Sequence, residues 1–229
     1  MARKRSSKSR RIAANDSVVV IGLGRFGRSL ATELVEEHTE VLGIDLDADT
    51  VQSMSGVLTH VVRADSTKEE VLRQLAVHEF TRAVVSIGTN LEASILTASL
   101  LVSFGIPDVW GKATSEAHGR ILSQLGVHHV VYPEHDMGQR VAHLVRGRML
   151  DYIEFEDDFA LVKTRTPSEM ADRTLAESAI RTRFGLTVVA VKRPGEGFTY
   201  ATADTVLRPD DTVIVAGRTE QTERFSELH

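Results

Sequence analysis

The sequence predicts an α/β protein: a doubly wound parallel sheet of six strands, followed by a crossover helix and a small α+β C-terminal lobe. Three observations support this fold class. Six short runs rich in β-branched residues alternate with helical segments of about ten residues. A glycine loop, Gly22-x-Gly24-x-x-Gly27, directly follows the first run. After Leu150, polar and apolar residues alternate, as in strands with one exposed face.

The alternating segments predict strands at 16–21, 40–45, 59–65, 82–87, 108–113 and 128–132. The predicted helices between them are 28–37, 48–54, 67–75, 91–104 and 115–124. Ser66 or Thr67 is the expected N-cap of the third helix, and Asn90 that of the fourth. Strands that alternate with helices form a parallel sheet covered on both faces.

Pro133 ends this alternation, and residues 137–150 are predicted to form a longer helix. In the remaining chain we expect alternating strand residues over 151–163, a short helix at 175–183, and strands at 187–192 and 212–216. The predicted domains are therefore 16–135, a crossover helix at 136–150, and 151–229.

Composition narrows the function. The chain has no cysteine, which excludes disulfides, thiol catalysis and cysteine-bound metals. Its longest apolar runs are too short to span a bilayer, and no apolar stretch follows the N-terminus as in a secretory signal.

The charge is distributed unevenly. Residues 1–12 hold six cations and no acid, which leaves −11 for the other residues, since the whole chain carries −5. We predict a disordered basic tail at 1–15, which serves either as a solubilising leader or as a contact for anionic lipid headgroups. The acidic remainder argues against nucleic acid as a partner, because phosphate contact needs a positive face.

The glycine loop predicts a Rossmann-type nucleotide site, because a strand precedes it and a helix follows it. Gly22 permits the tight turn, Gly24 lets the backbone approach a pyrophosphate, and Gly27 lets the helix pack on the strand. Asp45 ends the second predicted strand, where a carboxylate accepts hydrogen bonds from ribose hydroxyls. Arg25 is a cation within the loop and suits a phosphate tail.

Other polar residues follow the third and fourth strands at the same sheet edge, where ligands of open sheets bind. The residues predicted to bind the nucleotide are Gly22, Gly24, Arg25, Phe26, Gly27, Asp45, Leu46, Asp65, Ser66, Ile87, Gly88 and Asn90. Ser66 and Asn90 also have the simpler interpretation of helix caps. No histidines in a catalytic arrangement, P-loop or nucleophile elbow accompany this site, and the adjacent His128 and His129 point to opposite faces of their predicted strand. We therefore expect a binding module and not an enzyme.

Several stretches resemble the RCK-domain regulatory subunits of Trk- and Ktr-type potassium uptake systems, the Ktr type most closely. They are residues 20–27, 41–45, 87–94, 109–113 and 132–138, of which Tyr132-Pro133-Glu134-His135-Asp136-Met137-Gly138 is the most specific. The resemblance implies homodimers that assemble into an octameric ring on the cytosolic face of a membrane-embedded potassium transporter. It also implies that helix 136–150 takes part in dimerisation, and that ATP and ADP compete for the site, with NAD or NADH in some relatives.

By position, the resemblance places Arg25 and Lys112 at the phosphates, Asp45 at the ribose and Asp65 beside the adenine. It implies that Glu134 helps to hold an activating cation, Mg²⁺, Ca²⁺ or Na⁺, between dimer partners. The C-terminal lobe resembles a domain that binds cyclic di-AMP in several members, and the corresponding residues are Leu175, Ala176, Ile180, Arg181 and Phe184. This sequence differs from the usual isoleucines and tyrosine at three of them, Leu175, Ala176 and Phe184.

Three functions follow from these observations. The first is a cytoplasmic, membrane-peripheral subunit that gates potassium transport in response to ATP and ADP. The second is an NAD(P)-dependent oxidoreductase or an NAD(H)-responsive sensor. The third, a redox-sensing DNA-binding regulator, ranks last because the basic tail is the only basic segment.

Overall fold

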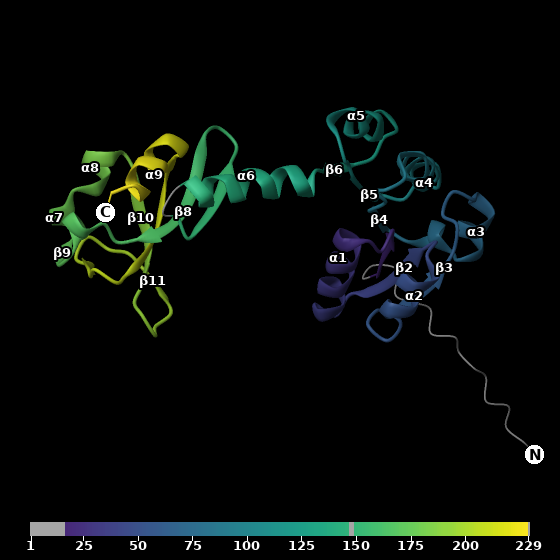
Figure 1. Cartoon of the computed structure of the whole chain (residues 1–229), viewed down its shortest axis with the longest axis horizontal. Helices are drawn as coiled ribbons and strands as arrows, with labels where there is room; N and C mark the ends of the chain where they lie inside the picture. Colours follow the sequence, from purple (N-terminus) through teal and green to yellow (C-terminus); the bar gives the residue numbers. More distant parts are fainter. Residues whose placement is uncertain (1–16, 147–148, 229) are drawn as a thin grey trace, which may run out of the picture. The chain divides into compact units, whose positions relative to one another are not determined.

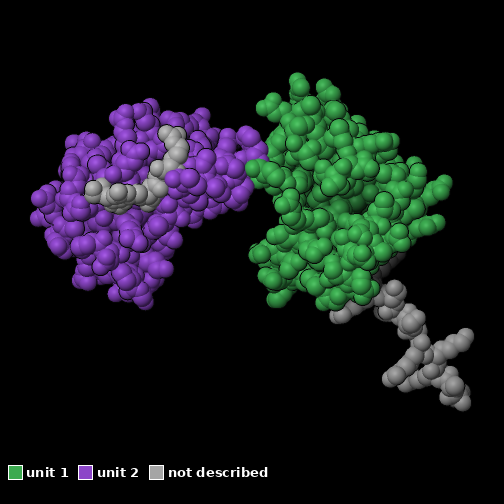
Figure 2. All heavy atoms as spheres, in the orientation of Figure 1, with its two compact units in different colours: residues 1–134 green, residues 135–229 purple. Residues whose placement is uncertain are grey.

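The computed structural model describes residues 17–146 and 149–228, and the predicted tail at 1–15 lies outside them. The chain divides into two compact units, Met1–Glu134 and His135–His229 (Figure 2). Among the described residues, no helix is both long enough and apolar enough to cross a bilayer. Each unit has its own hydrophobic core and is described by itself below.

The first unit contains the predicted parallel sheet, with strand order β3-β2-β1-β4-β5-β6 (Figure 1). Its strands are β1 Ser17–Ile21, β2 Glu40–Asp45, β3 His60–Arg63, β4 Arg82–Val85, β5 Asp108–Lys112 and β6 His129–Val131. Its helices are α1 Arg25–Glu36, α2 Ala48–Met54, α3 Glu69–Gln74, α4 Leu91–Ser103 and α5 Glu116–Gln124, with a 3-10 turn, η1, at Val77–Glu79. The predicted fold class is confirmed.

Helices cover both faces of this sheet, because its strands are apolar on both sides. Val18, Val20 and Val41 face α1 and α2, and contribute to one core. Val19 and Ile21 point to the opposite face, where they join side chains from α3, α4 and α5 in the other core. Alternating burial on two faces explains why β1 is a continuous apolar run.

Strand register brings the strand ends to one edge. Ile21 lies opposite Ile44 of β2 and Val85 of β4. The next residues along the chain, among them Gly22, Asp45 and Ser86, therefore meet at the carboxyl edge of the sheet.

Two predictions about helix starts in this unit were wrong. Helix α1 begins at Arg25 within the glycine loop, and not at Arg28, since only Gly22 of this loop needs a left-handed φ. Helix α3 has Lys68 as its N-cap, without a side-chain cap. The Ser66 hydroxyl instead hydrogen-bonds Thr97 of α4 at 2.8 Å, because Ser66 is buried against that helix. Asn90 does cap α4, accepting from the Ala93 N–H.

Helix α6, Pro133–Arg146, begins four residues before the predicted Met137 and ends before Leu150. Proline is favoured in the first turn of a helix, so Pro133 starts this helix and does not separate it from the preceding strand. The second unit then forms an antiparallel sheet of order β11-β10-β13-β8-β7. These strands are β7 Asp151–Phe155, β8 Phe159–Arg165, β10 Thr187–Lys192, β11 Phe198–Tyr200 and β13 Thr212–Arg218.

Shorter elements complete the second unit: η2 Ser168–Met170, α7 Leu175–Ser178, α8 Ile180–Phe184, α9 Thr219–Ser226, and the paired strands β9 Arg173–Thr174 and β12 Val206–Leu207. The single helix predicted at 175–183 is two helices, because Ala179 adopts a left-handed φ of 46°. Helix α9 was not predicted; its Phe225 is fully buried in the core of this unit.

Candidate nucleotide-binding site

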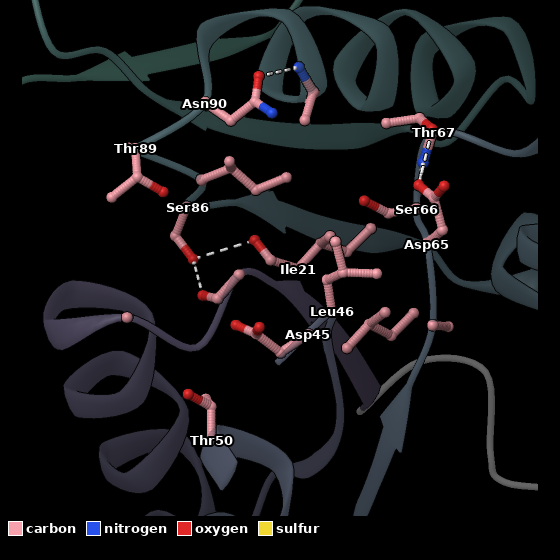
Figure 3. A pocket seen from close by; sticks show the side chains of 17 residues that line it. Ile21, Asp45, Leu46, Thr50, Asp65, Ser66, Thr67, Ser86, Thr89 and Asn90 are labelled. Carbon is pink, nitrogen blue, oxygen red and sulfur yellow. Dashed lines mark hydrogen bonds between the residues drawn. The ribbon is translucent and has the colours of Figure 1, made fainter. Parts of the chain in front are cut away.

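A cavity of about 330 Å³ opens at the carboxyl edge of the parallel sheet (Figure 3). Nine residues predicted from the sequence line it: Gly22, Gly24, Asp45, Leu46, Asp65, Ser66, Ile87, Gly88 and Asn90. Sequence reasoning missed Ile21, Ile44, Thr50, Ala64, Thr67, Ser86, Thr89 and Ala93, which also line it. Most of the missed residues adjoin a predicted one at a strand end, so the strand register is the signal that could have found them.

The glycines of the loop have three different surroundings. Gly22 has a φ of +91°, and a Cβ there would lie 2.9 Å from the Ile87 nitrogen. A Cβ at Gly27 would lie 1.9 Å from the Gly22 carbonyl oxygen, so the start of α1 packs directly on the loop. Gly24 faces open space, and a methyl group added there would have nothing within 4 Å. A ligand can therefore approach the backbone most closely at Gly24.

The N-terminus of α1 is left open for an anion. Its N-cap, Gly24, supplies no side-chain hydrogen bond, and its first turn has no acidic residue. Helices α2, α4 and α5 of the same unit are instead capped by Asp47, Asn90 and Ser115. Uncapped N–H groups and the positive end of the helix dipole together favour a phosphate.

Ser86, at the end of β4, holds the glycine loop in place. Its hydroxyl is buried and donates to the carbonyl oxygens of Gly22 and Ile21, the second at 3.1 Å. Figure 3 shows Ser86 beside the loop. This side chain fixes the loop against β4.

Asp45 closes β2 beside the loop. One carboxylate oxygen accepts the Leu23 N–H at 2.6 Å, and the other accepts the Asp47 N–H at 2.9 Å. Each carboxylate oxygen has a second lone pair, so Asp45 can still accept hydrogen bonds from two ribose hydroxyls. The exposed side chain of Leu46 adds apolar surface to the cavity.

Asp65, Ser66 and Thr67 lie on the opposite side of the cavity from Ser86 and Thr89 (Figure 3). The hydroxyl and N–H of Thr67 donate to Asp65 at 2.7 and 3.0 Å, and these bonds lower the pKa of Asp65. Asp65 is therefore ionised at neutral pH and held in one orientation.

The four other predicted contacts, Arg25, Phe26, Gly27 and Lys112, do not line the cavity itself. Lys112 is 8% exposed and donates to Glu134 at 2.5 Å. Its ammonium lies 5.8 Å from the centre of the Phe26 ring, and a Cβ at Gly88 would be 3.4 Å from it. Lys112 is thus next to the loop that borders the cavity.

Glu134 is the residue that the family resemblance assigned to a cation. The hydrogen bond from Lys112 lowers its pKa, with a smaller contribution from Arg25. In the described part of the chain, no group of three or more His, Asp or Glu side chains could hold a metal ion. Glu134 in one chain would therefore need further oxygen ligands, from phosphates, water or a second subunit.

The residues compared with a cyclic di-AMP site lie in the second unit. Leu175, Ala176, Ile180 and Arg181 line a cavity of about 280 Å³ there. Phe184 does not line it, because its ring packs edge-on against buried Phe225, with 5.6 Å between ring centres.

Two domain families match the chain in order: the TrkA-N domain at residues 18–133 and the TrkA-C domain at 159–229. Ktr system potassium uptake protein C of Bacillus subtilis (strain 168) is 39% identical, over 90% of this chain and 94% of that protein. Ktr system potassium uptake protein A of the same organism is 32% identical, over 92% of this chain and 96% of that protein.

Solved structures show the same fold. The GsuK RCK domain has a TM-score of 0.65 at 19% identity, over 93% of this chain and 47% of the other. The GsuK channel bound to NAD has a TM-score of 0.63 at 19% identity, over 93% of this chain and 39% of the other. The chain spans less than half the length of these GsuK chains. With both domain families matched and two Ktr proteins aligned along nearly all of its length, this chain belongs to the TrkA-N/TrkA-C (RCK) family of Ktr-type potassium uptake proteins.

Proposed function

We propose that the chain is a non-enzymatic regulatory subunit that senses an adenine nucleotide and gates a membrane-embedded potassium transporter from its cytosolic side. The observation that carries the nucleotide part is the uncapped N-terminus of α1, which lies next to a cavity that Asp45 borders. The transporter part is supported by the two Ktr relatives, which are named as potassium uptake proteins. Homodimers in an octameric ring on the membrane would transmit the response.

In the proposed complex, the phosphates approach Gly24 and the first turn of α1, and Asp45 accepts hydrogen bonds from the ribose. Leu46 and the Asp65 to Thr67 segment border the adenine. A carboxylate at the ribose disfavours a 2′-phosphate, so we expect NADP to bind weakly.

ATP and ADP would differ in their contacts with the cations beside the cavity. A ligand shifts a conformational equilibrium only by its differential affinity for the two states. The third phosphate of ATP adds charge that Arg25 and Lys112 can engage, and Glu134 would hold a divalent cation together with phosphate oxygens. Lys112 and Glu134 already form an ion pair, so phosphate and cation would exchange partners with this pair.

The test is thermal unfolding of the purified chain with ATP, ADP, AMP, NAD, NADH, NADP or cyclic di-AMP, with and without Mg²⁺ or Ca²⁺. A ligand at 100 times its Kd should stabilise the fold by about 2.7 kcal/mol. For a chain of this size that is a rise in Tm of roughly 5–10 °C. Asp45→Asn should remove most of the rise, whereas Asp49→Asn, an exposed acid of α2 that does not line the cavity, should keep it.

The proposal predicts a rise with both ATP and ADP, and a further rise with cation for ATP alone. A response confined to NAD and NADH would favour the second function, an NAD(H)-responsive sensor, for which the NAD-bound GsuK channel is the supporting observation. Potassium uptake into proteoliposomes that contain a Ktr-type membrane subunit tests the gating step. Uptake that is identical with ATP and with ADP would contradict nucleotide gating.

A further inference from the structure

One wall of the nucleotide cavity carries a pair of hydroxyl groups, those of Ser66 and Thr97. Ser66 lines the cavity and is 7% exposed. Its hydroxyl oxygen lies 2.8 Å from that of Thr97, which is fully buried in α4. Figure 3 shows the Ser66 hydroxyl directed into the cavity, beside Asp65. The pair therefore connects the wall of the cavity to the helix behind it.

This arrangement can present a fixed hydrogen-bond donor to a ligand. Two hydroxyl groups that share one hydrogen bond keep one proton for another partner. Thr97 does not line the cavity, so a ligand there meets Ser66 and not Thr97. When Thr97 donates to Ser66, the proton of Ser66 is free to point into the cavity. Because the bond to Thr97 already holds the Ser66 side chain, little further ordering is needed when a ligand binds.

Asp65, the preceding residue, supplies an acceptor at the same place. The N–H and the hydroxyl of Thr67 both donate to one carboxylate oxygen of Asp65, Oδ1, at 3.0 and 2.7 Å. The lone pairs of the other oxygen, Oδ2, are left for a ligand. Two consecutive residues after β3 therefore offer an acceptor and a donor side by side.

An acceptor beside a donor matches the Watson–Crick edge of adenine. That edge has an amino group, which donates, next to the ring nitrogen N1, which accepts. We propose that Ser66, oriented by Thr97, donates a hydrogen bond to N1 of the bound adenine, while Asp65 accepts one from the amino group. Guanine carries an oxygen in place of this amino group, and the carboxylate of Asp65 repels it. The inference rests on the proposed adenine-nucleotide site and assigns the side chains that select its base.

A third buried hydroxyl of α4 provides a matched control. Ser94 precedes Thr97 by three residues, so the two lie on the same side of the helix. Ser94 is 0% exposed, does not line the cavity, and has no hydrogen-bond partner for its hydroxyl among the described residues. Removal of an unpartnered buried hydroxyl costs little. Ser94→Ala therefore changes α4 without changing the pair of Ser66 and Thr97.

The test is isothermal titration of the full chain with ATP and two of its analogues. In 1-deaza-ATP a C–H group replaces N1, whereas 7-deaza-ATP keeps N1 and has C–H in place of N7. We expect the parent chain to bind 1-deaza-ATP about 5- to 50-fold more weakly than ATP, because the Ser66 hydroxyl is then left unpaired. The affinity for 7-deaza-ATP should be close to that for ATP.

The informative quantity for each variant is the ratio of its affinities for ATP and 1-deaza-ATP. Ser66→Ala should bind both equally. Thr97→Val keeps the shape of the side chain without its hydroxyl, and should reduce the ratio to about 2- to 5-fold, because Ser66 is no longer held. Thr97→Ser should restore the parent ratio, and Ser94→Ala should retain it. A purely structural role of Thr97 would instead weaken both ligands alike.

A change in stability cancels in this ratio, because both ligands are measured on the same variant. A parent chain that binds no ATP would overturn the proposed nucleotide site and the base contact together. A parent chain that binds ATP and 1-deaza-ATP equally would overturn the base contact alone, and so would an unchanged ratio in Ser66→Ala. A loss of affinity confined to 7-deaza-ATP would also overturn it, since the base would then present its other edge to Ser66.

Discussion

Substitution of two glycines in the same loop should separate folding from nucleotide binding. In Gly27→Ala the new Cβ would lie 1.9 Å from the Gly22 carbonyl oxygen and 2.4 Å from the Ser86 hydroxyl oxygen. An ordinary contact between carbon and oxygen needs about 3.3 Å, so α1 and the loop must separate by more than an ångström. Such overpacking costs about 1–3 kcal/mol or more. Alanine recovers about 1 kcal/mol of helix propensity. Because a separation of 1.9 Å is a severe overlap, the upper part of this range, about 2–3 kcal/mol, applies here, and the net loss of about 1–2 kcal/mol should lower Tm by roughly 2–8 °C.

Gly24→Ala should behave differently, because the backbone there has a φ of −66° and faces open space. The unliganded variant should unfold at the parent temperature or slightly above it, since alanine restricts the unfolded chain. A phosphate that approaches this backbone would meet the new methyl group. A clash of about 1–3 kcal/mol corresponds to roughly a 5- to 150-fold weaker affinity.

Differential scanning calorimetry of the unliganded variants and isothermal titration with the best nucleotide measure the two effects. Gly138→Ala in α6, which also has nothing within 4 Å, is the matched control and should retain the parent affinity. An unchanged affinity in Gly24→Ala would refute the close approach of phosphate to the loop. An unchanged Tm in Gly27→Ala would refute the packing argument.

Three further predictions concern buried polar groups. Ser86→Ala leaves the Gly22 carbonyl without its donor, and urea titration should show a loss of about 1–2 kcal/mol, with weaker nucleotide binding. Burial lowers the pKa of His118, so folding favours its neutral ring. The unfolded chain has the ordinary histidine pKa of about 6.5, so the stabilising contribution of His118 should be complete above about pH 6.5 and decline as the pH falls below it. His118→Gln should therefore flatten the curve of Tm against pH below about pH 6.5. Curves of the variant and the parent chain that run parallel in this range would contradict the assignment. Glu134→Gln removes the negative charge that pairs with buried Lys112. Because Glu134 is 62% exposed, water can replace it, and we expect the free energy of unfolding to fall by only about 0.5–1 kcal/mol. The cation-dependent part of the stabilisation by ATP should also be lost in the thermal assay.

The amino-acid sequence alone indicated the parallel sheet, because a strand that is buried on both faces must be apolar along nearly all of its length. Strand β1 is such a strand. It also placed Asp45 at the end of β2, since the glycine loop and the following helix leave little choice of register. Helix starts were less predictable. A side chain caps a helix only if it accepts a hydrogen bond from the first turn of that helix. The Ser66 side chain instead hydrogen-bonds Thr97, 31 residues away.

The family resemblance pointed to Lys112 and to Glu134 separately, and it did not predict that the two side chains contact each other. Their ion pair joins β5 to the first turn of α6, and depends on the packing of β6 between them. Ser86 is a similar case. A single serine after a strand belongs to no periodic pattern in the sequence, and its hydrogen bond to the glycine loop is found only once the fold places Gly22 and Gly27 beside it.

The sequence by itself therefore determined the fold class, the family and the glycine loop, because these follow from local periodicity and from motifs of fixed spacing. Only the tertiary structure decided which polar groups meet: Ser86 with the glycine loop, and Lys112 with Glu134. The physical reason is that hydrogen bonds and ion pairs depend on distances of about 3 Å between residues remote in the chain, which only the packed strands and helices establish.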